Sequence, residues 1–352
     1  MVLAGIFSQS LNAQNTKILN ADKHNEYGLV YTLPKTALEI EVTAKHTVKV
    51  AGPYYQYAKK FVGTDKVIKE NSENWVITDV KVKRYGVPDT SNRYLMQLKT
   101  GAPTYICVAE DGMLLGINKA VTLQENLSPE TPKSTSIGDL NINEYLQYVN
   151  EDFLSSQSSA KRAQMLAESL MEIRDAKVSL TRGTAETMPQ DGKQLELMLN
   201  SLSHQEASLT AAFIGMSSSE VVTRVFTYLP QQDGKDILFR MSDFAGFVDA
   251  DDYSGDPVYI STTVTNRGEL PVDVKGETKK IPKDAVIYTI PGSANITIST
   301  LGKTLYSREL DFGQYGVQFG LAPNLFSVKK NRSYATFDPV TGGLIEIGED
   351  GE

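Results

Sequence analysis

Alternating apolar and polar positions dominate the first third of the chain. In the run LEIEVTAK at 38–45, every second residue is apolar, and the same alternation returns over 76–82. A period of two places successive side chains on opposite faces of a strand, so each segment has one dry face and one wet face. We therefore predict a series of short β-strands over residues 27–118.

Two interruptions of this pattern predict a turn and a short helix. The run TYICVAEDGMLLGIN places Asp111 and Gly112 between two apolar stretches. This is typical of a type I′ β-hairpin, in which both turn residues take a positive φ. In AGPYYQYAKKFVG at 51–63, Gly52 ends a strand and Pro53 suits the first position of a helix.

The tyrosines of this short helix allow two interpretations. Tyr54, Tyr57 and Phe61 fall on one helical face, which predicts that they pack the helix onto the sheet. Alternatively, Tyr54, Tyr55 and Tyr57 form a stacking platform for a sugar ring, because aromatic faces pair with apolar sugar faces while the hydroxyls donate hydrogen bonds. Packing leaves Tyr55 as the one exposed ring.

The hydrophobic period changes to that of helices after a Ser-, Thr-, Pro- and Asn-rich linker at 124–138. Apolar residues at helical spacing run from Tyr145 to Ile173, past a serine-rich patch at 155–159 that bends or breaks the helix. Asp191, with Gln194 three residues later, predicts an N-cap and a capping box for a second helix. That helix ends near Gly215, so the pattern indicates a long antiparallel helical hairpin.

The leucine stripe of the second helix packs first against the preceding helix. Apolar residues left over from that packing would make the hairpin an arm for oligomerisation or for a second protein. The candidates for such an interface are Met171, Met198 and Phe213.

Strand patterns return from residue 221 onward, separated by turn sequences such as QQDG, DYSG and NRGE. The chain closes with two strands about the turn at 338–342. The fold class is therefore α+β and mostly β, with two sandwich-like β-rich regions separated by the helical hairpin. Whether those regions are two domains or two halves of one sheet system stays open. The predicted units are a signal-peptide remnant at 1–13, an N-terminal β-rich domain with one short helix at 14–138, the hairpin at 139–215 and a C-terminal β-sandwich-like domain at 216–352.

Composition narrows the class of protein. The 352 residues carry a formal net charge of −8 and no cluster of Lys and Arg, which argues against nucleic acid as a partner. No apolar run is long enough to predict a transmembrane span. The opening MVLAGIFSQSLNAQ reads as the rear part of a secretory signal, so we expect export to the periplasm or cell exterior of a bacterium. Cys107 is the single cysteine and forms no intrachain disulfide.

Several segments in this order resemble an exported-protein family defined by domain of unknown function 4831. The similarity rests on YTLPKTALEIEV, AGPYYQYAKKFVG, LTRGTAETMPQDGKQLELML, HQEASLTAAFIG and FDPVTGGLIEI. It covers nearly the whole chain after the signal. The resemblance implies a soluble envelope or secreted protein with β-rich parts around a helical hairpin, and it supplies no activity, substrate or catalytic residue.

Candidate chemistry is sparse. None of His24, His46 and His204 has a partner at metal-ligand spacing, so we assign them structural or surface roles. Hard cations such as Ca²⁺ take carboxylate oxygens from a tight loop, but GFVDADDYSGDP departs from the EF-hand pattern. We predict no cofactor, with Ca²⁺ as the alternative to a plain solvated loop. The candidate calcium ligands are Asp249, Asp251, Asp252 and Asp256.

The sequence alone does not establish a function. We expect a non-enzymatic exported protein that presents a binding or assembly surface to an envelope protein or a glycan, because sandwich-like scaffolds bind through loops and no nucleophile or base constellation is evident. The alternative is a hydrolase with dispersed carboxylates, for which Asp249, Asp251 and Glu110 are the first candidates.

Overall fold

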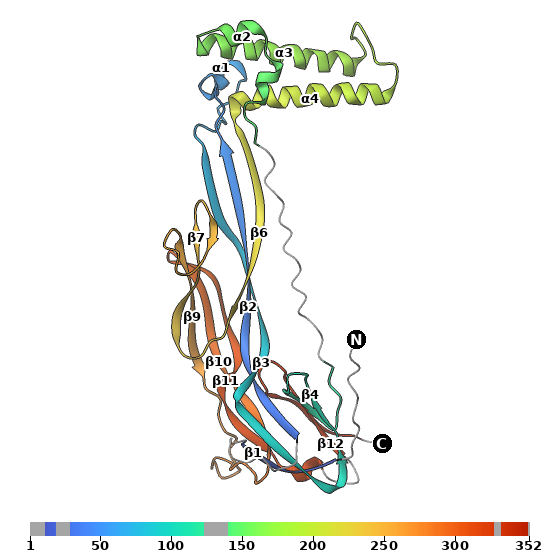
Figure 1. Ribbon diagram of the computed structural model, residues 1–352, viewed down its shortest axis with the longest axis vertical. Coiled ribbons are helices and arrows are strands. Elements are labelled where there is room, and N and C mark those ends of the chain that lie inside the picture. Colours follow the sequence, from blue (N-terminus) through green and yellow to red (C-terminus); the bar gives the residue numbers. More distant parts are fainter. Residues whose placement is uncertain (1–10, 19–28, 123–139, 327–331, 351–352) are drawn as a thin grey trace.

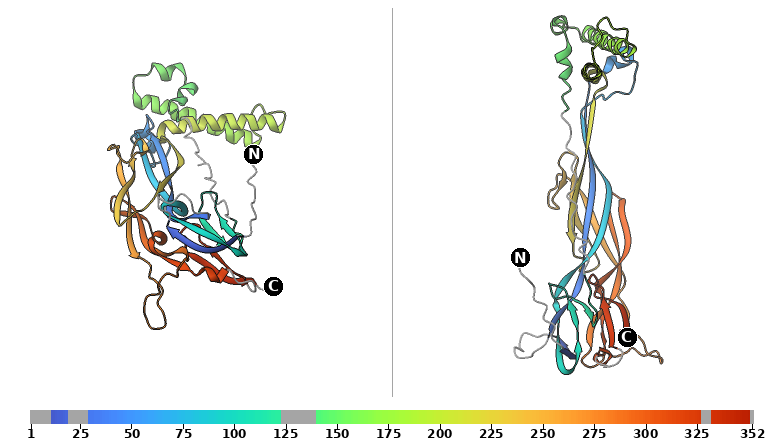
Figure 2. Two further views of the ribbon diagram at one scale, coloured as in Figure 1. Left: turned by 60° about the horizontal axis from the view of Figure 1, so that its bottom comes forward. Right: turned by 90° about the vertical axis from the view of Figure 1, so that its right-hand side faces the viewer.

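The computed structural model describes residues 11–18, 29–122, 140–326 and 332–350. The molecule is elongated, with a helical head at one end and a body of β-sheets at the other (Figures 1 and 2). A narrow β-ribbon joins them, which we define as the paired segments 44–50, 72–77 and 216–222. Among the helices in these ranges, none combines the length and the apolar character that crossing a bilayer takes.

The strands form three antiparallel sheets, and most of the described chain outside the head belongs to them. The first sheet has the order β1–β3–β2–β6, the second β11–β10–β9–β7–β8 and the third β13–β12–β5–β4. The strand bounds are β1 Leu11–Ile18, β2 Leu29–Val50, β3 Ser72–Thr104, β4 Ile106–Val108, β5 Leu114–Ile117, β6 Met216–Tyr228, β7 Gly234–Ser242, β8 Gly246–Val248, β9 Asp256–Asn266, β10 Val286–Thr300, β11 Lys303–Leu321, β12 Arg332–Phe337 and β13 Leu344–Asp350.

Two of the sheets are shared by strands from both sides of the helical segment. β6 pairs with β2 along 13 residues of each strand, and β12 pairs with β5. The fold is therefore one sheet system into which the helices are inserted. Of the two alternatives that the sequence left open, this pairing favours two halves of one sheet system, because hydrogen bonding joins strands that lie more than a hundred residues apart.

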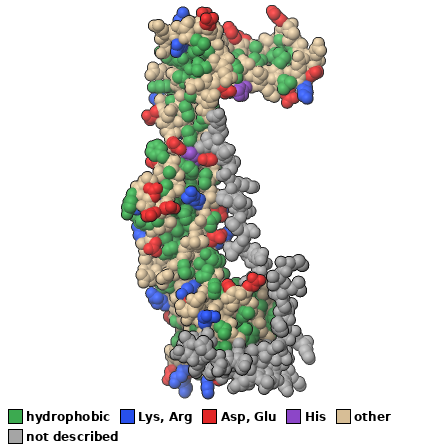
Figure 3. All heavy atoms as spheres, viewed as in Figure 1, with side chains coloured by type: hydrophobic (Ala, Val, Ile, Leu, Met, Phe, Trp, Pro, Cys, Tyr) green, Lys and Arg blue, Asp and Glu red, His purple; other side chains and the backbone are tan. Residues whose placement is uncertain are grey.

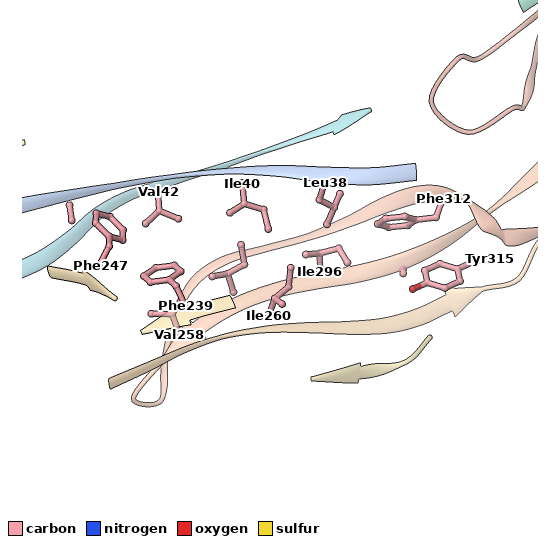
Figure 4. Close-up of a cluster of buried hydrophobic side chains, with 13 residues drawn as sticks. Leu38, Ile40, Val42, Phe239, Phe247, Val258, Ile260, Ile296, Phe312 and Tyr315 are labelled. Carbon is pink, nitrogen blue, oxygen red and sulfur yellow. The ribbon is translucent and has the colours of Figure 1, made fainter. Parts of the chain in front are cut away.

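The main core lies between the first and second sheets. Side chains from the alternating run of β2 face side chains of β7 to β11, as Figure 4 shows for Val42, Ile40 and Leu38 opposite Phe239, Ile260 and Ile296. The dry face predicted from the period of two is thus the face buried in the sandwich. The core residues are Leu38, Ile40, Val42, Ala44, Phe239, Phe247, Val258, Ile260, Ala294, Ile296, Ile298, Phe312 and Tyr315.

A second core joins the lower ends of all three sheets. It contains Tyr31 of β2, Met96 of β3, Tyr288 of β10 and Phe337 of β12, together with Phe326 of the short 3₁₀ helix η3 (Pro323–Phe326). The third sheet is therefore fixed to the sandwich by apolar contact as well as by backbone pairing.

β2 and β3 are far longer than the short strands that we predicted. They contain 22 and 33 residues and run from the body into the ribbon. Their pairing shifts register between Thr32 and Pro34 and again between Thr43 and Ala44. Such bulges bend a strand without ending it, so β2 and β3 stay paired past both points.

The hairpin between β4 and β5 also differs from prediction. Gly112 has a φ of +86°, whereas Asp111 is not among the non-glycine residues with positive φ. The N–H of Gly112 donates to the carbonyl of Ala109, and the N–H of Ala109 donates to the carbonyl of Met113. The connection is a three-residue loop closed by a glycine in the left-handed region, so the prediction of a type I′ turn is wrong.

Candidate interaction site

In the described residues, the head contains two long helices and four short helical segments, which surround an aromatic core of their own. α3 and α4 lie side by side and run in opposite directions in Figure 1, joined by the loop at 183–191. The smaller segments cover one end of this pair. Their bounds are η1 Tyr55–Tyr57, α1 Ala58–Phe61, η2 Glu144–Tyr148, α2 Glu151–Ser155, α3 Ser159–Arg182 and α4 Gly192–Ile214.

The ends of α4 follow the sequence signals. The Asp191 carboxylate accepts a hydrogen bond from the N–H of Gln194 at 2.8 Å, which confirms the predicted N-cap. The Gln194 side chain accepts from the N–H of Gln190 instead of that of Asp191, one residue away from capping-box geometry. Gly215, with a φ of +85°, ends the helix as predicted.

Tyr54 is a core residue of the head. It is 6% exposed and contacts the rings of Tyr145, Phe153 and Phe213 at centroid distances of 6.0–6.2 Å. Burial, together with the neighbouring Tyr54 hydroxyl, raises the pKa of Tyr145 to about 12. Because Tyr54 is enclosed on all sides, it cannot offer a ring face to a sugar.

Gly52 explains how this tyrosine reaches the helices. A Cβ at Gly52 would lie 2.6 Å from the carbonyl oxygen of Ala212, so only glycine lets the chain approach α4 so closely. The N–H of Tyr54, in the turn that follows, donates to that same carbonyl at 2.9 Å. The short helix therefore packs on α3 and α4, and the prediction that it packs onto the sheet is wrong.

The other two tyrosines of the cluster point elsewhere. Tyr57 is half-buried and contacts Phe61, with 6.4 Å between ring centroids. Tyr55 is also half-buried, and its hydroxyl accepts from the Gln56 amide at 3.4 Å. Tyr54, Tyr55 and Tyr57 thus do not share one exposed face, so the structure does not assemble them into a stacking platform.

The distal arm, which we define as residues 171–207, is packed much more thinly than the base of the head. Leu180 is the only buried side chain within this range, all of which the structure describes. At the base, by contrast, Leu166, Leu170 and Leu209 are fully buried. Figure 3 shows hydrophobic side chains among charged ones along this arm. Its exposed large apolar residues are Met171, Val178, Met188, Leu197 and Met198.

The predicted interface residues therefore divide into two groups. Met171 and Met198 are exposed on the distal arm, where a partner could reach them. Phe213 is fully buried in the head core, so its assignment to an interface is wrong. Helical periodicity places Phe213 on the apolar stripe, but it does not reveal that Tyr54 covers that end of the stripe.

Glu206 holds the two long helices together at the base of the arm. Its carboxylate accepts hydrogen bonds from Arg174 Nε and Lys177 Nζ, both at 2.8 Å. These two donors hold the pKa of Glu206 below its ordinary value. Glu206 is thus a polar link between α3 and α4.

We expect Glu206→Gln to lower the free energy of unfolding by about 1–2 kcal/mol at pH 7, because the negative charge that pairs with Arg174 and Lys177 is lost. A carboxyl group whose pKa is lower in the folded state stabilises the fold above its ordinary pKa and loses that effect as the pH falls. The difference between Glu206→Gln and the unsubstituted chain should therefore shrink below about pH 4. Urea titrations followed by circular dichroism at pH 7 and pH 3 measure it, and an equal difference at both pH values would contradict the role of charge.

A shallow groove of about 400 Å³ lies along the same helix where the arm meets the ribbon. Most of its lining comes from α4, with small side chains prominent among them, and Arg174 is the lining residue from α3. The groove is continuous with the distal arm through Ser203 and Ala207. Its lining residues are Arg174, Ser203, Glu206, Ala207, Thr210, Ala211, Ile214 and Gly215.

The acidic loop between β8 and β9 is organised by an arginine. Arg240 donates from Nε to the carbonyl of Ala250 at 2.9 Å and from Nη1 to the carbonyl of Gly255 at 3.1 Å, and its guanidinium lies 4.7 Å from the Tyr253 ring centroid. Hydrogen bonds from Ser254, together with the Arg240 charge, hold the pKa of Asp252 below its ordinary value. A cationic side chain thus satisfies carbonyls that would otherwise be available to a metal.

No three His, Cys, Asp or Glu side chains in the parts of the chain that the structure describes come together as a metal-binding group. The four candidate calcium ligands Asp249, Asp251, Asp252 and Asp256 are included in those parts, and a Ca²⁺ site there stays a prediction. The hydrolase candidates do not share one turn either, since Glu110 lies between β4 and β5 of the third sheet and Asp249 and Asp251 lie between β8 and β9 of the second.

The two described histidines have the structural or surface roles that the sequence predicted. His204 is exposed and lies 3.5 Å from a Glu144 carboxylate oxygen, and His24 lies outside the described residues. His46 is buried and contacts two carboxylates in the ribbon. One sequence signal indicates the burial of His46. It lies two residues beyond Ala44, so it falls on the same face of β2 as the alternating apolar residues.

These features define a mostly β protein that carries a helical head on a β-ribbon. The chain belongs to the family of domain of unknown function 4831, whose model matches residues 27–345, as the resemblance predicted. Neither the comparison with curated proteins nor the comparison with solved structures gave a match.

Proposed function

We propose that this protein is an exported, non-catalytic binding protein of the bacterial envelope, whose long antiparallel hairpin docks onto another protein. The observation that carries the proposal is the thin packing of the distal arm. A helical pair with one buried side chain over 37 positions, and with leucine and methionine exposed, has apolar surface that a partner would cover. Because the buried Tyr54 cannot offer a ring face to a sugar, we favour a protein partner over a glycan.

Charge indicates what kind of partner fits. Arg174, Lys177 and Glu206 neutralise one another in part at the base of the arm. The remaining charges are mainly acidic and exposed, and the only basic ones are Arg182 and Lys193. A partner with an apolar surface flanked by Lys and Arg would complement this arm, whereas a second copy of the same chain would repel it. The exposed acidic residues are Glu172, Asp175, Glu186, Asp191 and Glu196.

The ribbon supports the same proposal. It holds the head away from the β-body, so a partner can approach the arm without contact with the sandwich (Figure 2). The body in turn supplies a large buried core as a rigid support. Small helical surfaces bind through a few apolar anchors, and Leu197, which is 62% exposed, is the most exposed apolar side chain of the arm.

We expect Leu197→Glu to weaken partner binding by roughly tenfold or more, because an apolar anchor is replaced by a charge of the same sign as its surroundings. A photoreactive residue at position 197 of the full chain, irradiated in native envelopes, would identify the partner. Binding of the purified partner to the Leu197→Glu chain is then measured by calorimetry. Val274→Glu in the body is the matched control, since Val274 is fully exposed.

Two results would contradict this proposal. One is that Leu197→Glu and Val274→Glu bind the purified partner equally well. The other is that the chain crosslinks to a second copy of itself at position 197. Because Leu197 contributes little to the core, both variants should unfold at the same urea concentration as the unsubstituted chain.

A further inference from the structure

His46 ends the buried face of the sandwich where the ribbon begins. It lies on the same side of β2 as the core residues Leu38 to Ala44 and is 7% exposed. Its neighbours across the sheet are Trp75 on β3 and Glu220 on β6. His46 is thus the last buried residue of β2 on the way from the sandwich core to the head.

Both ring nitrogens of His46 contact carboxylates. Nδ1 lies 2.9 Å from Oε1 of Glu220, and Nε2 lies 2.7 Å from Oε1 of Glu73. A neutral imidazole has one N–H and one lone pair, so it can donate to only one of these acceptors. When both carboxylates are ionised, both contacts are hydrogen bonds only if the ring is doubly protonated and positively charged.

Trp75 connects this charged ring to the second sheet. Its indole stacks on the imidazole with 4.2 Å between centroids and an interplanar angle of 8°, and Phe247 of β8 contacts it edge-on at 6.4 Å. A Cβ on Gly246 would lie 2.8 Å from the indole, so glycine lets β8 lie directly on this ring. The β7–β8 hairpin thus sits on Trp75, and Trp75 sits on His46.

The Trp75 indole also destabilises the arrangement in which β8 packs on it. Its N–H is buried and has no acceptor among the described residues. An unsatisfied buried donor destabilises the state that contains it and regains a partner in water when that state opens. The β7–β8 hairpin can pack on Trp75 or detach from it. The free-energy difference between these two arrangements is therefore smaller than an ordinary core contact would give.

The other charges near this layer do not replace the two carboxylates. Lys45, next to His46 on β2, faces the opposite side of the sheet, where Val76 and Val221 flank it. Arg224 of β6 lies 5.5 Å from the Phe247 ring centroid. Glu73 and Glu220 are thus the charged groups that pair with His46 in the described structure, one from each neighbouring strand.

We propose that His46, Glu73, Glu220 and Trp75 form a proton-dependent brace that seats the β7–β8 hairpin on the ribbon. With His46 charged, both carboxylates hold the ring and β3 and β6 are tied to β2. When His46 loses its proton, one carboxylate faces a lone pair and turns to solvent, which loosens the stack on Trp75 and unseats β8. The brace is therefore closed while the ring carries both protons and weakens once the ring has lost one of them. This inference does not depend on the proposed partner of the arm.

Trp75 is the only tryptophan of the chain, so its fluorescence reports on the brace directly. In the full chain, we expect the emission of Trp75 to increase and shift to longer wavelength between about pH 5 and pH 9. Over the same range, the protection factors of the β8 amides, which are exchange rates corrected for the intrinsic effect of pH, should fall roughly tenfold, because one charged hydrogen bond is lost. Both changes should disappear in His46→Gln and persist in His204→Gln, the matched control on an exposed histidine.

Imidazole ¹⁵N chemical shifts of the unsubstituted chain test the same inference without relying on the folding of His46→Gln. The signal of His46 is assigned as the one that neither His24→Gln nor His204→Gln removes. Two protonated nitrogens at pH 6 and a change in step with Trp75 emission would support the brace. A singly protonated ring at pH 6, or an emission spectrum that is constant from pH 5 to pH 9, would overturn it.

Discussion

Replacing Phe213 with alanine is expected to lower the free energy of unfolding of the head by about 3–5 kcal/mol. Phe213 is fully buried, and its ring meets Tyr54 within a cluster that also contains Tyr145 and Phe153. Alanine would remove the shared contact of η1 and α4 and leave a cavity. The head core is small and is fixed by the Gly52–Ala212 approach, so it cannot collapse around that cavity.

Two optical probes separate the head from the ribbon in this experiment. Most helical residues lie in the head, so circular dichroism at 222 nm follows the head, while Trp75 fluorescence follows the ribbon. In urea, the Phe213→Ala chain should lose helix at a lower concentration, and its Trp75 transition should move much less. Leu197→Ala is the matched control: it removes a large apolar side chain from the same helix at an exposed position, and we expect a change below about 0.5 kcal/mol.

Equal shifts for Phe213→Ala and Leu197→Ala would contradict the division of the head into a packed base and a thinly packed arm. A helix transition and a Trp75 transition that move together by the same amount would contradict separate unfolding of the head and the ribbon. That second result would mean that the head and ribbon unfold as one cooperative unit.

Local signals in the sequence predicted the features that depend on neighbouring residues. Asp191 and Gly215 mark the ends of α4 correctly, because a cap and a left-handed glycine act within one turn of the helix. The alternation from Leu38 to Ala44 identified the buried face of β2 for the same reason. The mostly β fold class follows from several such segments.

The features that depend on distant pairing were not predictable in this way. Nothing in the local pattern shows that β6 completes the sheet of β2, or that β12 pairs with β5. The same limitation affected the candidate residues. Phe213 was assigned to an interface because its cover, Tyr54, lies far away in the sequence. The partners of His46 were not predicted because Glu73 and Glu220 come from two other strands.

Gly86 marks a second place where distant backbones meet, at the junction of β3 with the turn at 338–342. On the neighbouring strand, Thr36 is fully buried and donates from its hydroxyl to the carbonyl of Val340 at 2.9 Å. The same hydroxyl accepts from the N–H of Gly313 at 3.0 Å. This turn precedes β13, so the contact fixes the C-terminal β12–β13 hairpin onto β2, β3 and β11.

Gly86→Ala is expected to lower the free energy of unfolding by about 3 kcal/mol or more, because overpacking here meets main chain that cannot rotate away. A Cβ at Gly86 would lie 1.9 Å from the carbonyl oxygen of Pro339. To make room, the turn must move off the sheet, which leaves the buried Thr36 hydroxyl without Val340 as its acceptor. Gly234→Ala in β7 is the matched control, since its nearest atom would be 4.0 Å away. Urea denaturation followed by Trp75 fluorescence measures both variants, and faster hydrogen exchange over β12 and β13 in Gly86→Ala alone would locate the effect. Equal stability of the two variants would contradict the close approach of Pro339 to β3.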